Sequence, residues 1–138
     1  MKIVIINGPN LNLLGKRETA IYGEDSFDTI YTQLQQQFPQ VQFSYVQSNV
    51  EGELINALHE YGFSADGIIL NPGGYTHTSV AIGDAVAAIT SPVIEVHLTN
   101  VHAREAFRKI SHVSVQCKGT ISGLGAKGYA LAVTALLP

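Results

Sequence analysis

The sequence predicts an α/β fold in which helices cover both faces of a parallel sheet. Short apolar runs rich in β-branched residues alternate with helical patterns along the 138 residues. The runs are apolar at almost every position, which is typical of strands that are buried on both faces. The presence of five such runs indicates a flavodoxin-like, doubly wound, five-stranded parallel sheet. No linker, repeat or low-complexity tract interrupts this alternation, so we expect a single domain spanning residues 1–138.

The first half of the chain contains two predicted strands and two predicted helices. The opening apolar run has only four residues before Asn7, far too few for a signal peptide or a membrane span. The next pattern places apolar side chains at helical spacing until Pro39 ends it. Ser48 and Glu51 form a capping box, which predicts the start of a helix that Gly62 closes. The elements predicted here are a strand at 3–6, a helix at 25–38, a strand at 41–46 and a helix at 48–62.

The second half continues the alternation and adds three predicted strands. The run after Gly67 is wholly apolar, and the alanine-rich segment after Ser79 favours a helix. Cys117 lies in an apolar pattern that we assign to the fifth strand, which argues against a nucleophilic thiol. The elements predicted here are a strand at 67–70, a helix at 79–89, strands at 92–98 and 113–117, and a helix at 124–137.

Composition limits the partners that the protein can have. Charged residues make up only 14% of the chain, a low share for a small monomer, so we expect part of the surface to be buried against sister chains. The net charge is −3, and the sequence contains no cluster of Lys or Arg that could neutralise a run of phosphates, which excludes nucleic acid as a partner. The single cysteine cannot form an intrachain disulfide. We therefore expect a cytoplasmic homo-oligomer that contacts no membrane.

Polar and ionisable residues gather directly after three of the predicted strands, in segments 7–12, 71–79 and 97–104. Ligands of doubly wound sheets bind beyond the carboxyl ends of the strands, so we expect these segments to form one site. The loop 7–24 is long for a compact domain and carries Arg17 and Tyr22. We predict that it is a lid over a ligand, and a solvated surface loop is the alternative.

Histidine is the candidate for acid–base chemistry in these segments. His97 ends a predicted strand, and the ordinary pKa of histidine suits proton transfer near neutral pH. The alternative for His97 is a structural, hydrogen-bonded histidine. His77 precedes Thr78 and Ser79, either of which could cap the next helix, so it could belong to that cap instead. No HExxH pattern or other closely spaced set of His, Cys and carboxylate residues occurs, so we expect no metal.

The segment 123–128 matches the GxGxxG fingerprint of dinucleotide-binding proteins. A true fingerprint is followed by a βαβ unit and by an acidic residue about twenty positions later. Only ten residues follow Gly128, and none of them is acidic. We therefore expect no nucleotide cofactor, and we interpret the glycines as a chance match or as a device for close packing of the last helix.

Taken together, the motifs of the chain resemble those of the type II 3-dehydroquinate dehydratases. The resemblance implies a flavodoxin-like fold and a dodecamer built from trimers. It also implies anti elimination of water from 3-dehydroquinate, giving 3-dehydroshikimate through an enolate without metal, cofactor or covalent imine. The pathway served is either the shikimate pathway to aromatic amino acids or quinate catabolism. The matching stretches are 6–12, 14–15, 17–18, 21–23, 47–49, 51–52, 71–73, 75–79, 95–98, 100–105, 107–108, 123–125 and 128–129.

The resemblance implies a role for each matching residue. Tyr22 is expected to take the C2 proton and His97 to protonate the departing C1 hydroxyl, with Glu95 orienting His97. The other expected contacts are Arg17 and Arg104 near Tyr22, Asn10 with a water that stabilises the enolate, Asn71, Leu98 and Thr99 on the carboxylate and the C1 oxygen, His77 and Arg108 on ring hydroxyls, and Asp84 reaching the substrate from a neighbouring subunit.

Elementary chemistry supports this assignment. A free phenol has a pKa near 10, so only about one tyrosine in a thousand is ionised at pH 7, and a tyrosine base needs positive charge beside it. Guanidinium groups within about 4–6 Å favour the phenolate, and Arg17 and Arg104 are the candidates. The ketone beside the lost proton places negative charge on oxygen, for which Asn10 and its water supply a donor. Hydroxide is a poor leaving group, so a general acid such as His97 must accompany the base.

The chain departs from the usual pattern of the family at three positions. Thr19 stands where a proline is common, which concerns the order of the lid. Gly83 stands where an arginine is usual, which concerns a contact between subunits. Thr99 replaces a serine and keeps the hydroxyl. The rival to a lyase is a flavodoxin-like module that binds a small acid without turning it over, and such a module would not need both Tyr22 and His97.

Overall fold

The computed structural model describes residues 1–16 and 18–138. Its sheet has five strands, all parallel, in the order β2-β1-β3-β4-β5. This order is that of the flavodoxin-like doubly wound fold, so the predicted fold class is confirmed. The strands are β1 (Lys2–Asn7), β2 (Gln42–Gln47), β3 (Gly67–Asn71), β4 (Val93–His97) and β5 (Gly119–Ser122).

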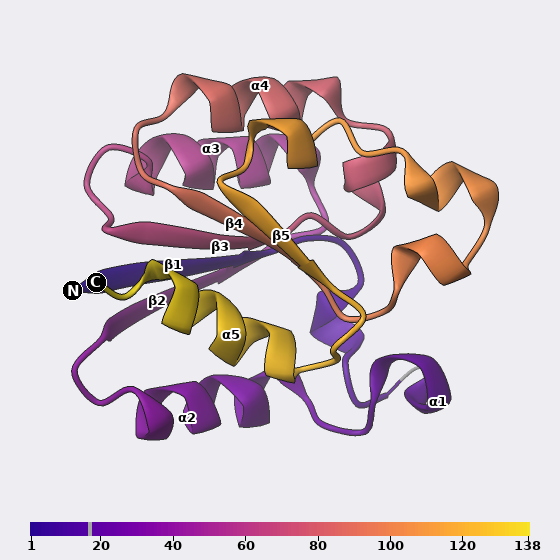
Figure 1. Ribbon diagram of the computed structural model, residues 1–138, viewed down its shortest axis with the longest axis horizontal. Helices are drawn as coiled ribbons and strands as arrows, with labels where there is room; N and C mark the ends of the chain where they lie inside the picture. The colour runs from indigo at the N-terminus through magenta and orange to yellow at the C-terminus, as the bar shows by residue number, and fades with distance from the viewer. Residues whose placement is uncertain (17) are drawn as a thin grey trace.

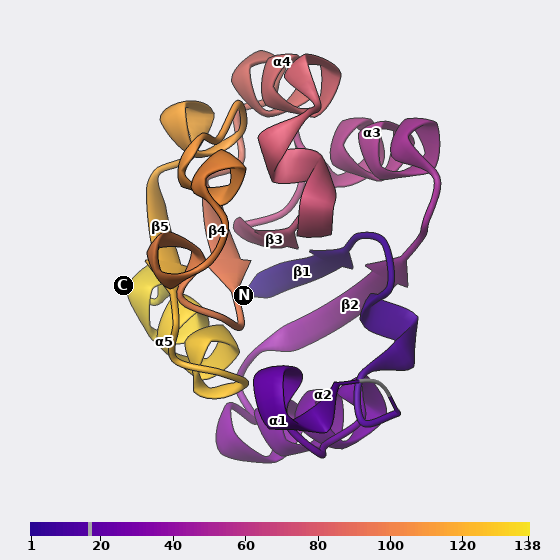
Figure 2. The ribbon, with the colours of Figure 1, turned by 90° about the vertical axis from the view of Figure 1, so that its right-hand side faces the viewer.

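Two pairs of helices cover the two faces of the sheet (Figures 1 and 2). One face carries α2 (Phe27–Gln37) and α5 (Lys127–Leu136), and the other carries α3 (Glu51–Tyr61) and α4 (Val80–Ala88). Side chains of β1 alternate between the two resulting cores, with Ile5 in the first and Val4 in the second, both fully buried. Burying an aliphatic side chain stabilises the fold by about 1.5–3 kcal/mol, which explains why the central strands are apolar at nearly every position.

Side-chain caps set the start of two helices. Ser26 Oγ accepts the Thr29 N–H at α2, and Ser79 Oγ accepts the Ile82 N–H at 2.9 Å, so Ser79 is the one of the two predicted candidates that caps α4. The capping box predicted at Ser48 is wrong. The helix α3 begins only at Glu51, because the chain stays extended at Val50 (φ −101°) while it turns out of β2. Ser48 Oγ instead accepts the Val50 N–H.

The predicted fifth strand at 113–117 is also wrong. The Ser111 hydroxyl accepts the N–H groups of Val113 (3.2 Å) and Ser114 (2.9 Å), and the segment turns into the 3₁₀ helix η5 (Ser114–Gln116). Its Val113 is fully buried in the core below α4, so the apolar signal came from one packed turn. The true fifth strand, β5, lies at the edge of the sheet and is only partly buried, so its sequence does not need to be apolar.

Short helices occupy the connections at the carboxyl ends of the strands, at the right-hand end of the sheet in Figure 1. Of these, the sequence suggested only a short helix near His102 and Arg104, where η3 lies. No helix within residues 1–16 and 18–138 is long and apolar enough to cross a membrane. The short helices are η1 (Leu11–Leu13), α1 (Thr19–Tyr22), η2 (Gly73–His77), η3 (Val101–Ala103) and η4 (Ala106–Lys109).

Candidate active site

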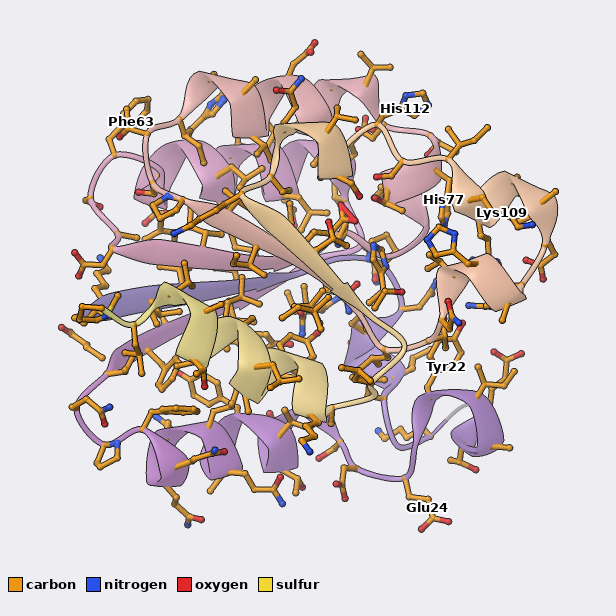
Figure 3. The ribbon with its side chains drawn as sticks, in the orientation of Figure 1. Tyr22, Glu24, Phe63, His77, Lys109 and His112 are labelled. Carbon is orange, nitrogen blue, oxygen red and sulfur yellow. The ribbon has the colours of Figure 1, made fainter. Side chains whose placement is uncertain are left out.

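A cavity of about 190 Å³ opens beyond the carboxyl ends of β1, β3 and β4. In Figure 3, Tyr22 and His77 both lie at this end of the sheet. Segments that are far apart in the sequence therefore converge at the edge that the strand-end rule indicated. The predicted site residues that line the cavity are Asn10, Tyr22, Asn71, His77, His97, Leu98, Thr99, Arg104 and Arg108.

Two glycines allow the first two polar segments to pack closely. A Cβ on Gly8 would lie 2.6 Å from the carbonyl oxygen of Pro72, a distance that only glycine avoids. The Gly8 N–H donates to the Asn71 carbonyl at 2.7 Å. Gly73 has a φ of +60°, in the left-handed region that favours glycine. The cavity wall formed by these segments thus depends on the absence of side chains at both positions.

His97 is held by a buried carboxylate. Its Nε2 lies 2.7 Å from Oε2 of Glu95, a residue two positions earlier on β4 that is 1% exposed. An ionised carboxylate only accepts hydrogen bonds, so Nε2 carries the proton and Nδ1 is the nitrogen that can exchange a proton with a ligand. Glu95 does not line the cavity, and it contacts His97, which does.

Hydroxyl groups complete the shell around the Glu95 carboxylate. Thr76 Oγ1 donates to it at 3.0 Å and Ser114 Oγ at 2.7 Å, while Ser111 Oγ lies 2.7 Å from Thr76 Oγ1. Burial acts to raise the pKa of Glu95, but the hydrogen bond and charge interaction with His97, together with the two hydroxyls, outweigh it and hold the pKa below its ordinary value. Glu95 is therefore a carboxylate at neutral pH, and it is hydrogen-bonded to His97 in that form.

Tyr22 reaches the cavity from α1. It is half-buried, and the guanidinium carbon of Arg104 lies 5.6 Å from the centre of its ring. Arg104 is itself positioned by a hydrogen bond from Nη1 to Thr99 Oγ1 at 3.3 Å. The structure thus brings Tyr22, Arg104 and Thr99 together. Arg17, the other predicted cation, lies outside the described residues.

His77 and Arg108 form another side of the cavity. His77 Nδ1 lies 2.7 Å from the carbonyl oxygen of Ile110, so Nδ1 donates and Nε2 is left with a lone pair. The ring of His77 is 6.5 Å from that of His97 and packs edge-on against Phe107. Arg108 is paired with Glu105 through Nε. His77 precedes the cap at Ser79 and takes no part in it.

Several predicted or excluded features lie away from the cavity. Asp84 is exposed on α4 and does not line the cavity of its own chain.

Burial raises the pKa of the Cys117 thiol to about 12, which agrees with its exclusion as a nucleophile. At Gly128 an added Cβ would lie 3.3 Å from Val96, so the glycine-rich segment packs the last helix against β4. No group of three or more His, Cys, Asp or Glu side chains among the described residues could hold a metal ion.

Four residues with no role assigned from the sequence are connected to the site in the structure, namely Thr76, Ser114, Asn7 and Tyr129, although Asn7 and Thr76 lie in the polar segments predicted to form it. Asn71 Nδ2 donates to the Tyr129 hydroxyl at 3.0 Å, and that hydroxyl donates to Asn7 Oδ1 at 2.8 Å. Asn7 and Asn71 are paired in register at the ends of β1 and β3. The available signal was a polar residue within an apolar strand or helix pattern, since Tyr129 lies among the alanines and leucines of α5.

The fold and the cavity define a flavodoxin-like α/β enzyme with an acid–base site at the carboxyl edge of its sheet. Comparison with known proteins agrees with this class. The family model described as "Dehydroquinase class II" matches residues 1–137. The 3-dehydroquinate dehydratase of Fusobacterium nucleatum is 52% identical over 99% of this chain and 97% of its own, and that of an Exiguobacterium species is 51% identical over 99% and 94%. The chain belongs to the class II dehydroquinase family, and its activity class is that of a 3-dehydroquinate dehydratase, a lyase.

Solved structures support the same assignment. The type II dehydroquinase of Butyrivibrio crossotus superimposes with a TM-score of 0.95 at 44% identity, covering 99% of this chain and 97% of that one. The type II dehydroquinase of Propionibacterium acnes gives a TM-score of 0.91 at 37% identity, covering 98% and 94%. The resemblance inferred from the sequence motifs is therefore confirmed.

Proposed function

We propose that the protein converts 3-dehydroquinate to 3-dehydroshikimate by anti elimination, with Tyr22 as the base and His97 as the acid. The observation that carries the proposal is the presence of both side chains on one cavity, each beside a group of the required charge. Arg104 lies on the Tyr22 ring and Glu95 is hydrogen-bonded to His97. A binding module that turned nothing over would have no need of two oppositely assisted proton-transfer groups.

In the first step, the Tyr22 phenolate takes the proton from C2. The electrons of the C2–H bond pass into the neighbouring ketone and form an enolate. Arg104, whose guanidinium carbon lies 5.6 Å from the centre of the Tyr22 ring, and Arg17, from the same loop as Tyr22, are proposed to supply positive charge beside the phenolate. Asn10, which lines the cavity, is proposed to hold a water that donates to the enolate oxygen.

In the second step, His97 gives a proton to the C1 hydroxyl, which leaves as water. The enolate electrons form the C1–C2 double bond as the C1–O bond breaks, so atoms and charges balance. The carboxylate of Glu95 is hydrogen-bonded to Nε2 of His97 and is proposed to hold the ring with Nδ1 toward the substrate. Tyr22 ends this step protonated and His97 neutral, and solvent restores both. This route uses neither a metal nor a covalent imine.

The remaining lining residues are proposed to bind the substrate. Asn71, Leu98 and Thr99 are assigned to the carboxylate and the C1 oxygen, and His77 and Arg108 to ring hydroxyls. Asp84 is exposed and lies outside the cavity of its own chain, which agrees with a role on the substrate of a neighbouring subunit. We propose a dodecamer of four trimers that works in the cytoplasm. Activity should therefore follow assembly, and fully active isolated monomers would contradict the role of Asp84.

The decisive test is a direct assay of the purified protein with 3-dehydroquinate in EDTA, which follows the near-UV absorbance of the conjugated product. We expect turnover that survives chelation and falls by about 10²–10⁴-fold or more in His97→Ala, because general acid catalysis contributes that much. His59→Ala, at an exposed histidine on α3, is the matched control and should retain full activity. A folded, assembled parent that binds cyclic acids without turnover would favour the binding module.

A further inference from the structure

The amide of Asn71 is held in one orientation by groups on both sides. Its Oδ1 accepts the Gly73 N–H at 3.2 Å, and its Nδ2 donates to the Tyr129 hydroxyl at 3.0 Å. Asn71 is 3% exposed and lines the cavity. An amide nitrogen carries two N–H groups, so one N–H is used by Tyr129 and the other is left for a ligand in the cavity.

The direction of these hydrogen bonds is set by Tyr129 and Asn7. The single proton of the Tyr129 hydroxyl goes to Asn7 Oδ1 at 2.8 Å, so a lone pair of the phenol oxygen faces Asn71. If the Asn71 amide were turned over, its oxygen would meet that lone pair and its nitrogen would meet the Gly73 N–H. Both contacts would be repulsive. Complete burial raises the pKa of Tyr129, so the phenol keeps its proton and its role as a donor.

This arrangement carries a cost that packing alone does not explain. Asn7 is fully buried, and its Nδ2 makes no hydrogen bond of normal geometry with any described residue. Its side chain also interacts with the Tyr45 hydroxyl, which offsets part of the rise that burial causes in the pKa of Tyr45. A buried donor without a full partner is unfavourable, and such groups in native proteins often reflect function. What Asn7 contributes is the acceptor that orients the Tyr129 hydroxyl.

We infer that Tyr129 and Asn7 are positioning residues, which hold the Asn71 amide with an N–H directed to the carboxylate of the substrate. The inference rests on the proposed function, in which Asn71 binds that carboxylate. Tyr129 reaches the site from α5, where its ring packs in the core with its centre 5.2 Å from that of Phe27. The core of one face of the sheet thus determines the polarity of a binding group in the cavity.

The test compares Tyr129→Phe with the parent, using 3-dehydroquinate as the substrate and two competitive inhibitors, quinate and its methyl ester. We expect KM for 3-dehydroquinate to rise about tenfold with a much smaller change in kcat, because a contact made equally in ground and transition states affects binding only. Inhibition by quinate should weaken by about the same factor while inhibition by the ester is nearly unchanged, since the ester lacks the charged group. Tyr31→Phe, at a tyrosine of the same aromatic cluster, is the matched control and should behave as the parent.

Equal weakening of quinate and ester in Tyr129→Phe would show a general loss of packing and overturn the inference, as would parent-like constants for both. If Tyr129→Phe does not fold, Asn7→Ala is measured instead, and the ratio of the inhibition constants of the ester and quinate decides. We expect the preference for quinate to fall by about threefold, because the Tyr129 oxygen remains. If the parent shows no turnover but still binds quinate more tightly than the ester, the proposed function fails. The roles of Tyr129 and Asn7 are then decided by whether their variants lose this preference for quinate, so the two failures are distinguishable.

Discussion

His97 and Tyr22 line the same cavity, but the molecule supports them in different ways. His97 ends a central strand, is 8% exposed, and is hydrogen-bonded to a carboxylate that two hydroxyls also contact. Tyr22 ends a four-residue helix in the connection after β1 and is half-buried, with Arg104 on its ring. The proposed acid is therefore built into the core of the sheet, whereas the proposed base belongs to a peripheral segment.

Because of this difference, losing His97 and losing Tyr22 should affect activity and folding stability differently. A substitution near His97 disturbs a buried polar network, so activity and folding should change together. A substitution at Tyr22 removes a group from the periphery, so activity should change alone.

Tyr22→Phe should produce the largest separation between activity and stability. We expect kcat to fall by about 10³-fold with a change in the free energy of unfolding below about 0.5 kcal/mol, because a single hydroxyl at a half-buried site is lost. Steady-state kinetics and denaturant unfolding measure the two quantities. Tyr61→Phe is a matched control, since Tyr61 is also half-buried and has a cation, Lys2, 5.0 Å from its ring. A large loss of stability in Tyr22→Phe would contradict the comparison.

Glu95→Gln should lower activity and stability together. The change removes the negative charge that is hydrogen-bonded to His97, so kcat should fall at least about tenfold. The glutamine amide would also place an NH₂ group against the donors of Thr76, His97 and Ser114, all of which point at the carboxylate. This mismatch should lower the free energy of unfolding by about 1–3 kcal/mol. Glu60→Gln, at an exposed carboxylate on α3, controls for the loss of one charge. If Glu95→Gln kept full stability, the buried network would not be the element that holds His97.

Gly83→Ala should have a smaller effect on activity than Glu95→Gln, and it should act through the segment that packs beside the Glu95 network. A Cβ at Gly83 would lie 2.3 Å from the His112 carbonyl oxygen, so α4 and the segment that carries Ser111 and Ser114 must separate. We expect a loss of about 1–3 kcal/mol in unfolding free energy and a modest fall in kcat. At Gly52 in α3 nothing lies within 4 Å of an added Cβ, so Gly52→Ala should stabilise by up to about 1 kcal/mol. Equal effects of the two substitutions would contradict this account.

The dependence of stability on pH should carry the signature of Glu95. Its pKa in the folded protein is lowered from an ordinary value of 4.5, so it binds its proton more readily in the unfolded chain. Its contribution to stability is then fully present above pH 4.5 and is lost as the pH falls through the lower, folded pKa. Denaturant unfolding at a series of acid pH values should give a shallower decline for Glu95→Gln than for the parent. Identical slopes would show that other carboxylates control acid unfolding.

Much of the fold could be predicted because the central strands are buried on both faces. Such strands must be apolar at nearly every position, so β1, β3 and β4 are evident in the sequence. The edge strand β5 was missed because an edge requires less burial. The run at 113–117 was misassigned because one buried valine in a 3₁₀ turn gives the same local signal as a strand. The four-residue helix α1 was missed because so short a pattern has no periodicity to detect.

The sequence by itself determined which polar residues come to the edge of the sheet, since the order of strands and the residues after them are properties of the chain. Only the tertiary structure decided how those residues are supported. The links from Asn71 to Tyr129 and from Glu95 to Ser114 span 58 and 19 positions. No local spacing encodes such contacts, because they exist only once helices have packed on the sheet. The physical reason is that hydrogen bonds depend on distances in space, which the fold sets, and burial then makes each of those bonds costly to lose.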